Sequence, residues 1–128
     1  MDRRWVILRH TLFEDSLEGL HYDLLLEDIE DCRTWRLSDI PVLNGPFVDA
    51  IAIAPHKLYW LEKEESLVSG GRGWAKRIYR GNFFGSLPSS KNELLSVDLV
   101  SSFSSLRGRL KILDSLCSIT SNSKFDFN

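Results

Sequence analysis

Short stretches in which apolar and polar residues alternate follow one another along most of the chain. The segment LHYDLLLE, residues 20–27, is the clearest of them. Side chains of a β-strand point alternately to its two faces, so this pattern predicts a strand with two different faces. One face carries Leu20, Tyr22, Leu24 and Leu26, and the other carries His21, Asp23, Leu25 and Glu27. The first set fits a protein core, whereas the second places an imidazole and a carboxylate side by side.

Similar stretches, separated by turn residues, occur along the rest of the chain. They predict strands at residues 5–10, 33–37, 48–54, 74–79, 82–87, 94–100 and 106–113. We expect the pair at 74–79 and 82–87 to form a hairpin around Arg80 and Gly81. Residues 57–61 fit another strand, and residues 89–95 and 114–119 each fit a single turn of helix.

This succession of short strands predicts an all-β fold. We expect a compact small β-barrel of about eight mostly antiparallel strands with short helical turns. The tryptophans at positions 35 and 74 fit its core. The predicted domain spans residues 1–117, and residues 118–128 are expected to form a polar C-terminal tail.

The composition narrows the class of protein. A chain of 128 residues, 43% of them hydrophobic, suits one domain with its own core. Its 16 basic and 18 acidic residues give a net charge of −2, so no overall field draws it to nucleic acid or to anionic membranes. A nucleic-acid role would therefore be local, at one strand end or one nick.

Two further features bear on where the protein works. No apolar run approaches the ~20 residues of a membrane helix, and the apolar stretch near the N-terminus is too short for a signal peptide. Two cysteines, Cys32 and Cys117, are too few for a disulfide framework. We therefore expect a cytoplasmic protein with reduced thiols and no membrane contact, and we expect it to be a monomer.

The chain has only three histidines, and each lies in or beside a predicted strand. His10 shares a face with Val6 and Leu8, and His21 lies two residues before Asp23. By alternation, His56 shares a face with the alanines at positions 50, 52 and 54, whose small side chains leave room for a cavity. Three imidazoles and a carboxylate suit Zn²⁺, Mn²⁺ or Fe²⁺. The alternative is a set of structural histidines that only form hydrogen bonds.

The segment HYDLLLE, residues 21–27, resembles HYDLRLE in the 3′-phosphoesterase domain of bacterial DNA ligase D, the end-joining ligase. Other segments resemble further motifs of that family in the same order. They are WVILRH at 5–10, TWRL at 34–37, AIAIAPHKLYW at 50–60, GGRGWAKRIYRGNF at 70–83 and LRGRLKIL at 106–113. The resemblance covers residues 4–114, nearly the whole predicted domain.

This resemblance implies a compact β-barrel with an active site in a groove on one side. It implies a divalent metal, Mn²⁺ before Zn²⁺, and removal of a 3′-terminal phosphate or ribonucleotide from a DNA end. The motif positions imply that His10, His21 and Asp23 bind the metal and that they are catalytic together with His56. His56 would lie at the metal or the phosphate, where a protonated imidazole serves the phosphate or the leaving group.

The chain departs from the family at two arginines, which are expected to bind phosphate. Leu25 and Val48 occupy those positions, and neither side chain replaces the planar donor fork of arginine. Arginines on other segments would have to substitute, and we select Arg72, within GGRG, and Arg9 as the phosphate-binding candidates. The other two arginines considered are at positions 36 and 77.

Three hypotheses follow for the function. The first is a metal-dependent phosphoesterase that acts on a nucleic-acid 3′ end or a smaller phosphoester. The second is a catalytically degenerate module that binds metal and nucleic-acid ends within a repair complex, with a DNA ligase or another repair protein as partner. The third is a purely structural role for the histidines. Metal affinity separates the third from the others, and turnover separates the first two.

Overall fold

The computed structural model describes residues 3–90, 92–101 and 106–121. Nine strands and two 3₁₀ turns make up this part of the chain. They are, in order, β1 (Arg3–Thr11), β2 (His21–Glu27), β3 (Cys32–Leu37), β4 (Val48–His56), η1 (Leu58–Leu61), β5 (Glu65–Leu67), η2 (Ser69–Gly71), β6 (Trp74–Phe84), β7 (Leu95–Val100), β8 (Gly108–Leu113) and β9 (Leu116–Thr120). The expected all-β class is confirmed for the described residues.

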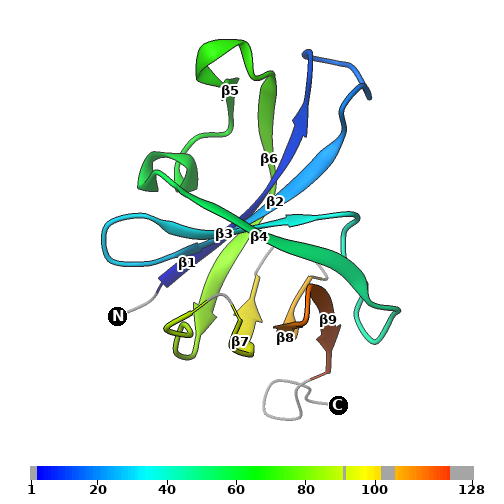
Figure 1. Cartoon of the computed structure of the whole chain (residues 1–128), viewed down its shortest axis with the longest axis vertical. Helices are drawn as coiled ribbons and strands as arrows, with labels where there is room; N and C mark the ends of the chain where they lie inside the picture. The colour runs from blue at the N-terminus through cyan, green and yellow to red at the C-terminus, as the bar shows by residue number, and fades with distance from the viewer. Residues whose placement is uncertain (1–2, 91, 102–105, 122–128) are drawn as a thin grey trace.

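The strands form one sheet in the order β1-β2-β3-β4-β9-β8-β7-β6-β5, and every pairing between these strands is antiparallel. β1 also pairs with β6, so the sheet closes on itself (Figure 1). β5 lies outside this closure and pairs only with β6 among the described strands. Closure removes most of the exposed sheet edge, which would otherwise be open to pairing with other chains.

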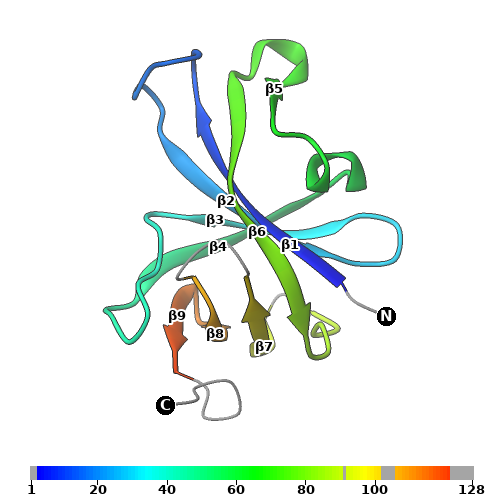
Figure 2. The same ribbon diagram turned by 180° about the vertical axis from the view of Figure 1, so that it is seen from behind.

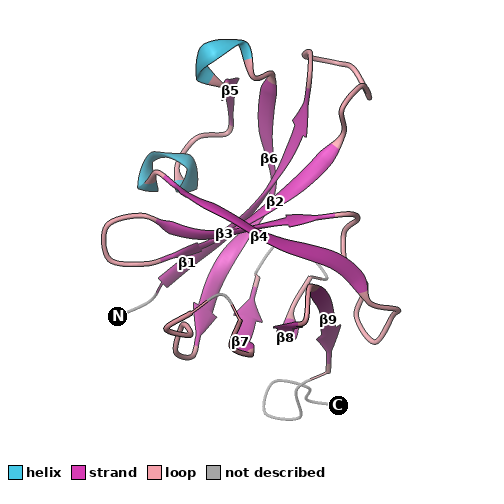
Figure 3. Ribbon diagram, viewed as in Figure 1, coloured by secondary structure: helices cyan, strands magenta, loops and turns pink. Residues whose placement is uncertain are grey.

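The two ends of the molecule are built differently (Figures 1 and 2). β7, β8 and β9 lie at one end, and β5 with the two 3₁₀ turns lies at the other (Figure 3). Two groups of buried side chains match this division. The larger core lies inside the closed sheet and includes Trp5, Leu24, Trp35 and Phe83. The smaller cluster consists of Val6, Leu8, Leu25, Cys32, Leu61 and Ala75, with residues of η1 packed against it.

β1 and β2 separate the two clusters, which explains their runs of consecutive apolar residues. The four residues from Trp5 to Leu8 are all at most 2% exposed, and they alternate between the larger core and the smaller cluster. In β2, Leu24 and Leu26 enter the larger core, whereas Leu25 enters the smaller cluster. A strand buried on both faces does not show the alternation of apolar and polar residues that is typical of a strand with one solvent-exposed face.

The hairpin expected around Arg80 and Gly81 is wrong, because β6 runs unbroken from Trp74 to Phe84. Gly81 lies where a Cβ would collide with the Val100 carbonyl oxygen and would stand 2.7 Å from the indole nitrogen of Trp5. Glycine therefore permits a close approach inside a strand at this position, rather than a turn.

Several boundaries also differ from the sequence prediction. Residues 58–61 form a 3₁₀ turn rather than a strand. Residues 114–119 do not form a helical turn, and neither do the described residues 89–90 and 92–95. Asp114 and Ser115, with φ of 52° and 62°, make the tight turn between β8 and β9. β9 extends to Thr120, so residues 118–120 belong to the sheet and not to a tail, while residues 122–128 lie outside the described residues.

The two tryptophans predicted for the core differ. Trp35 is buried in the larger core, whereas Trp74 is only half-buried and its indole N–H donates to a carboxylate oxygen of Glu65. Among the described residues, no helix is long and apolar enough to cross a membrane.

Candidate metal and phosphate site

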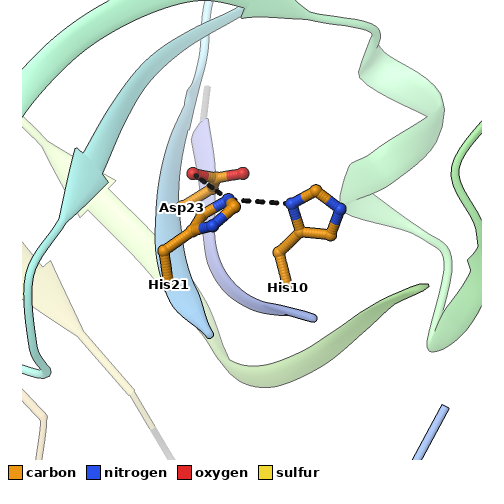
Figure 4. Close-up of side chains that lie close together, drawn as sticks. All are labelled: His10, His21 and Asp23. Atoms are coloured by element: carbon orange, nitrogen blue, oxygen red, sulfur yellow. Dashed lines mark hydrogen bonds and ion pairs between the residues drawn. The ribbon is translucent and has the colours of Figure 1, made fainter. Parts of the chain in front are cut away.

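The three residues predicted as metal ligands meet near the loop that connects β1 to β2 (Figure 4). In the antiparallel register His10 lies opposite His21, and Asp23 lies opposite Leu8. Cross-strand neighbours and residues two apart on one strand share a face, so all three side chains are on the face of the smaller cluster. One nitrogen or oxygen atom from each of the three lies within 4.8 Å of the others.

His56 reaches the same face because of a bulge that the sequence pattern did not reveal. Thr34 lies opposite Ile53, but Cys32 lies opposite His56, so β4 has one extra residue in this interval. The extra residue reverses the alternation. His56 therefore lies on the face opposite to Ala50 and Ala52, which pack with the larger core, and the predicted shared face is wrong. The backbone N–H of His56 donates to Thr34 Oγ1 at 3.2 Å, which holds the bulge.

One ring nitrogen of each histidine forms a hydrogen bond with a backbone carbonyl oxygen. The carbonyl oxygen of Arg72 lies 2.6 Å from His10 Nε2, that of Gly19 lies 3.1 Å from His21 Nδ1, and that of Ala54 lies 3.3 Å from His56 Nδ1. A carbonyl oxygen only accepts, so these three nitrogens carry the hydrogen. In a neutral imidazole the second nitrogen then has a free lone pair. Such second contacts are typical of histidines that bind metals.

The second nitrogens of His10 and His21 face each other. His10 Nδ1 lies 2.8 Å from His21 Nε2, with the two rings nearly perpendicular at 88° (Figure 4). Because the other nitrogen of each ring already donates, two neutral rings would present two lone pairs to one another. Such a contact requires a positive charge between the rings, either a proton or a metal ion.

Asp23 adds a negative charge to the same place. It is 4% exposed, and among the described residues nothing donates a hydrogen bond to its Oδ1. Oδ1 lies 3.7 Å from His21 Nε2, and Oδ2 lies 3.6 Å from His56 Nε2. Burial by itself raises the pKa of the Asp23 carboxyl, but His21 and His56 outweigh it and hold that pKa well below its usual range. The carboxylate is therefore ionised at neutral pH and needs a cation nearby.

These groups fit a divalent cation. Ligand atoms about 2.1 Å from an ion lie about 3.0–3.4 Å apart in octahedral or tetrahedral geometry. The separations of 2.8 Å and 3.7 Å around His21 Nε2 bracket this range. Burial is the main cause that lowers the pKa of His10, which keeps this imidazole neutral and able to bind metal. The unsatisfied Oδ1 of Asp23 supplies the charged ligand.

A groove of about 680 Å³ opens beside these residues. His10, Asp23 and His56 belong to its lining. The lining also includes residues of η1, β5 and the segments beside them, namely Lys57, Tyr59, Trp60, Leu67, Val68 and Arg72. The groove thus joins the cluster to a wall that has apolar, aromatic and cationic groups.

The two arginines selected as phosphate-binding candidates lie in different places. Arg72 lines the groove. Arg9 precedes His10 on β1 and so points to the other face, where its guanidinium donates to the carbonyl of Ser16 at 3.4 Å. Of the other arginines considered, Arg77 donates to the carbonyl of Leu61, and Arg36 lies opposite Asp23 on β3. Arg36, and not Arg9, is the second arginine at the cluster.

The resemblance implies arginines at positions 25 and 48, but in this structure the side chains at both positions pack against the protein interior. Leu25 is fully buried in the smaller cluster, and Val48 packs against the larger core. An arginine at either position would point into packed apolar side chains. The apolar surroundings therefore suit leucine and valine at these positions and would not suit arginine.

The sequence did not reveal how His10 is oriented. Gly73, with φ of 106°, follows Arg72 and lies against β1. A Cβ there would collide with the Thr11 carbonyl oxygen and lie 3.1 Å from His10 Nε2. Only glycine lets the loop approach closely enough for the Arg72 carbonyl to reach His10. The run GGRG was the available signal, although it reads equally well as an ordinary turn.

Comparison with the models of known protein families finds no match to this chain. Comparison with curated proteins finds no similar sequence either.

Proposed function

We propose that the protein is a metal-dependent phosphoesterase that acts on a 3′-terminal phosphate or ribonucleotide at a DNA end. His10, His21 and Asp23 would hold a divalent cation, Mn²⁺ before Zn²⁺. The observation that carries the proposal is the orientation of the three histidines. Each donates one ring N–H to a backbone carbonyl. The other nitrogens of His21 and His56 lie 3.7 Å and 3.6 Å from an ionised, buried carboxylate, and that of His10 lies 2.8 Å from His21 Nε2.

A bound divalent cation supplies polarisation of a phosphoryl oxygen and activation of water. The residues of this chain would do the rest. Arg72 and Lys57 would attract the phosphoryl group to the groove wall. His56 Nε2, which lies 3.6 Å from Asp23 Oδ2, would hold a proton for the leaving oxygen.

The groove favours a terminal group over continuous duplex. Its cationic side chains are few, and the net charge of the chain is −2. A protein that wraps duplex DNA usually neutralises many phosphates through a basic face. One phosphoryl group at a strand end needs only the local charges. Tyr59 and Trp60 add an aromatic wall on which a terminal base could stack.

A second candidate is a module that binds metal and a nucleic-acid end without turnover, with a DNA ligase or another repair protein as its partner. The burial of Leu25 and the packing of Val48 against the larger core favour it, because the two arginines that the resemblance implies are absent from these positions. Loss of phosphate-binding arginines reduces turnover more than it reduces metal binding.

The test combines metal binding with turnover. Calorimetric titration with Mn²⁺ and Zn²⁺ would use wild type, His21→Ala and Asp23→Asn, with Asp49→Asn, an exposed carboxylate on β4, as the matched control. The same samples would be assayed on DNA primers that end in a 3′-phosphate or one ribonucleotide. We expect wild type and Asp49→Asn to bind metal and to turn over substrate, and the two site variants to do neither.

The other outcomes separate the hypotheses. Metal binding by wild type without turnover on either primer would replace the enzyme by the binding module. Absence of metal binding by wild type would overturn both, and the cluster would then hold a shared proton as part of the structure.

A further inference from the structure

Arg36 is the cross-strand neighbour of Asp23, on β3. Neighbours of this kind share a face of the sheet, so its side chain lies on the face of the histidine cluster. Its Nε is 3.8 Å from Asp23 Oδ1, which is too far for a hydrogen bond. Arg36 thus lies beside the proposed metal ligands without donating a hydrogen bond to Asp23 Oδ1.

The donors of Arg36 distinguish it from other arginines of the sheet. Arg4 donates to Glu27 and Glu62, Arg33 to Asp28, and Arg109 to Asp98. Arg36, by contrast, donates no hydrogen bond within the described parts of the chain, and its side chain is 48% exposed. A fork of five donors is therefore available to a ligand next to the cluster.

We propose that Arg36 binds the phosphoryl group of the substrate beside His10, His21 and Asp23. The inference rests on the proposed function and adds the residue that positions the substrate oxygens. Two residues beyond Asp23 on its own strand, position 25 holds a buried leucine. On the neighbouring strand, by contrast, Arg36 brings its guanidinium to within 3.8 Å of Asp23 Oδ1.

The charges around the cluster support this role. Asp23 Oδ1 lies between His21 and Arg36, so a cation that uses Oδ1 as a ligand comes close to the guanidinium. Arg36 would then lose the attraction of Asp23 and gain from an anion bound at that cation. Arg72 and Lys57 lie in the groove wall. Asp23 belongs to the lining of this groove and lies 3.8 Å from Arg36 Nε, so Arg36 would add its charge to those of Arg72 and Lys57.

The geometry of the donors favours an oxyanion such as phosphate over a halide. A guanidinium presents parallel N–H groups that match two oxygens of a phosphoryl group. The metal would hold a third oxygen. A halide has no such pair of acceptors and would use only the charge.

Titration with inorganic phosphate, followed by calorimetry, tests the role directly. The samples would be wild type, Arg36→Gln, Arg36→Lys and Arg33→Gln, each first loaded with Mn²⁺ and then repeated with EDTA. Arg33 is the matched control because it lies on the same strand, and its odd spacing from Arg36 directs it to the opposite face. Thermal unfolding of each variant would show that the fold is retained.

We expect Arg36→Gln to weaken phosphate binding by about tenfold or more, the effect of one charge-assisted hydrogen bond. Arg36→Lys should recover only part of the affinity, because it keeps the charge and loses the fork. Arg33→Gln should bind phosphate within about twofold of wild type. Mn²⁺ affinity of Arg36→Gln should equal or exceed that of wild type, since a neighbouring positive charge is removed.

Two failures are distinguishable. If Mn²⁺ binds to wild type and Arg36→Gln still binds phosphate as tightly as wild type does, this inference is overturned and the metal site stands. If wild type binds no Mn²⁺, the proposed function fails and the inference fails with it.

Discussion

Replacement of Asp23 by asparagine should have opposite consequences with and without metal. Without metal, the carboxylate is buried, one of its oxygens lacks a donor, and its contacts with the two imidazoles are 3.6 Å and 3.7 Å long. Asn removes a buried charge and adds an N–H₂ group that can donate to either imidazole. We therefore expect the free energy of unfolding of metal-free Asp23→Asn to differ from that of wild type by no more than about 1 kcal/mol.

With metal, wild type should gain stability that the variant does not. A ligand at 100 times its dissociation constant stabilises the folded state by about 2.7 kcal/mol. For a chain of 128 residues this gain raises the midpoint of thermal unfolding by about 10 °C. Asp23→Asn loses the charged ligand, so its midpoint should rise by less than about 3 °C at the same Mn²⁺ concentration.

The assay is thermal unfolding followed by circular dichroism at neutral pH, once with EDTA and once with Mn²⁺ at the concentration fixed by the wild-type titration. Asp49→Asn, an exposed carboxylate, serves as the control and should behave like wild type. A loss of more than about 3 kcal/mol in metal-free Asp23→Asn would refute the reasoning, because it would mark the carboxylate as one partner of a stabilising buried ion pair. An equal metal-dependent rise in wild type and Asp23→Asn would refute it too.

Three further predictions concern the surroundings of the site. Gly73→Ala should reduce metal affinity at least about tenfold, because the Arg72 carbonyl can no longer reach His10. Gly71→Ala is the control in the same titration, because Gly71 also has a positive φ, of 68°, but has no atom within 4 Å of the new Cβ. Leu25→Arg should cost more than about 3 kcal/mol in denaturant unfolding and should not restore phosphate binding, since the position is fully buried; a stable, phosphate-binding variant would contradict this. Burial raises the pKa of both Cys32 and Cys117 to about 12. Between about pH 9 and 12 the unfolded chain therefore releases thiol protons that the folded chain keeps, and the free energy of unfolding should fall by about 1.4 kcal/mol per pH unit for each thiol. Guanidinium unfolding of the variant with alanine at both positions should lack this fall.

The sequence predicted the fold class because the period-two signal is local. Residues 95–100 show it clearly, and they form a strand. It failed where a distant contact decides the conformation. Gly81 reads as a turn residue, but the indole of Trp5 and the Val100 carbonyl explain its presence within β6. Such a contact, across more than seventy residues of chain, leaves no mark on the local pattern.

The candidate site divides in the same way. His21 and Asp23 share a face by spacing alone, and His10 joins them through the antiparallel hairpin that begins the chain. Arg36 joins them only through the register between β2 and β3. That register depends on the length of the connecting turn, and a shift by one residue would move Arg36 to the other face. For this reason the sequence could not distinguish Arg36 from Arg9 as the arginine of the cluster.

The three carbonyls that orient the histidines all come from irregular backbone, and this has a physical reason. In a regular ladder the carbonyls lie in the plane of the sheet and accept from the next strand, so they are not available to a side chain on its face. Here they belong to Gly19 with φ of 67°, to Ala54 in the bulge of β4, and to Arg72 just before Gly73. The regular strands thus place the imidazoles, while the irregular residues fix which nitrogen of each imidazole faces the cluster. A chain with the same three histidines and aspartate on regular strands, but without these irregular segments, would have the ligands without their orientation.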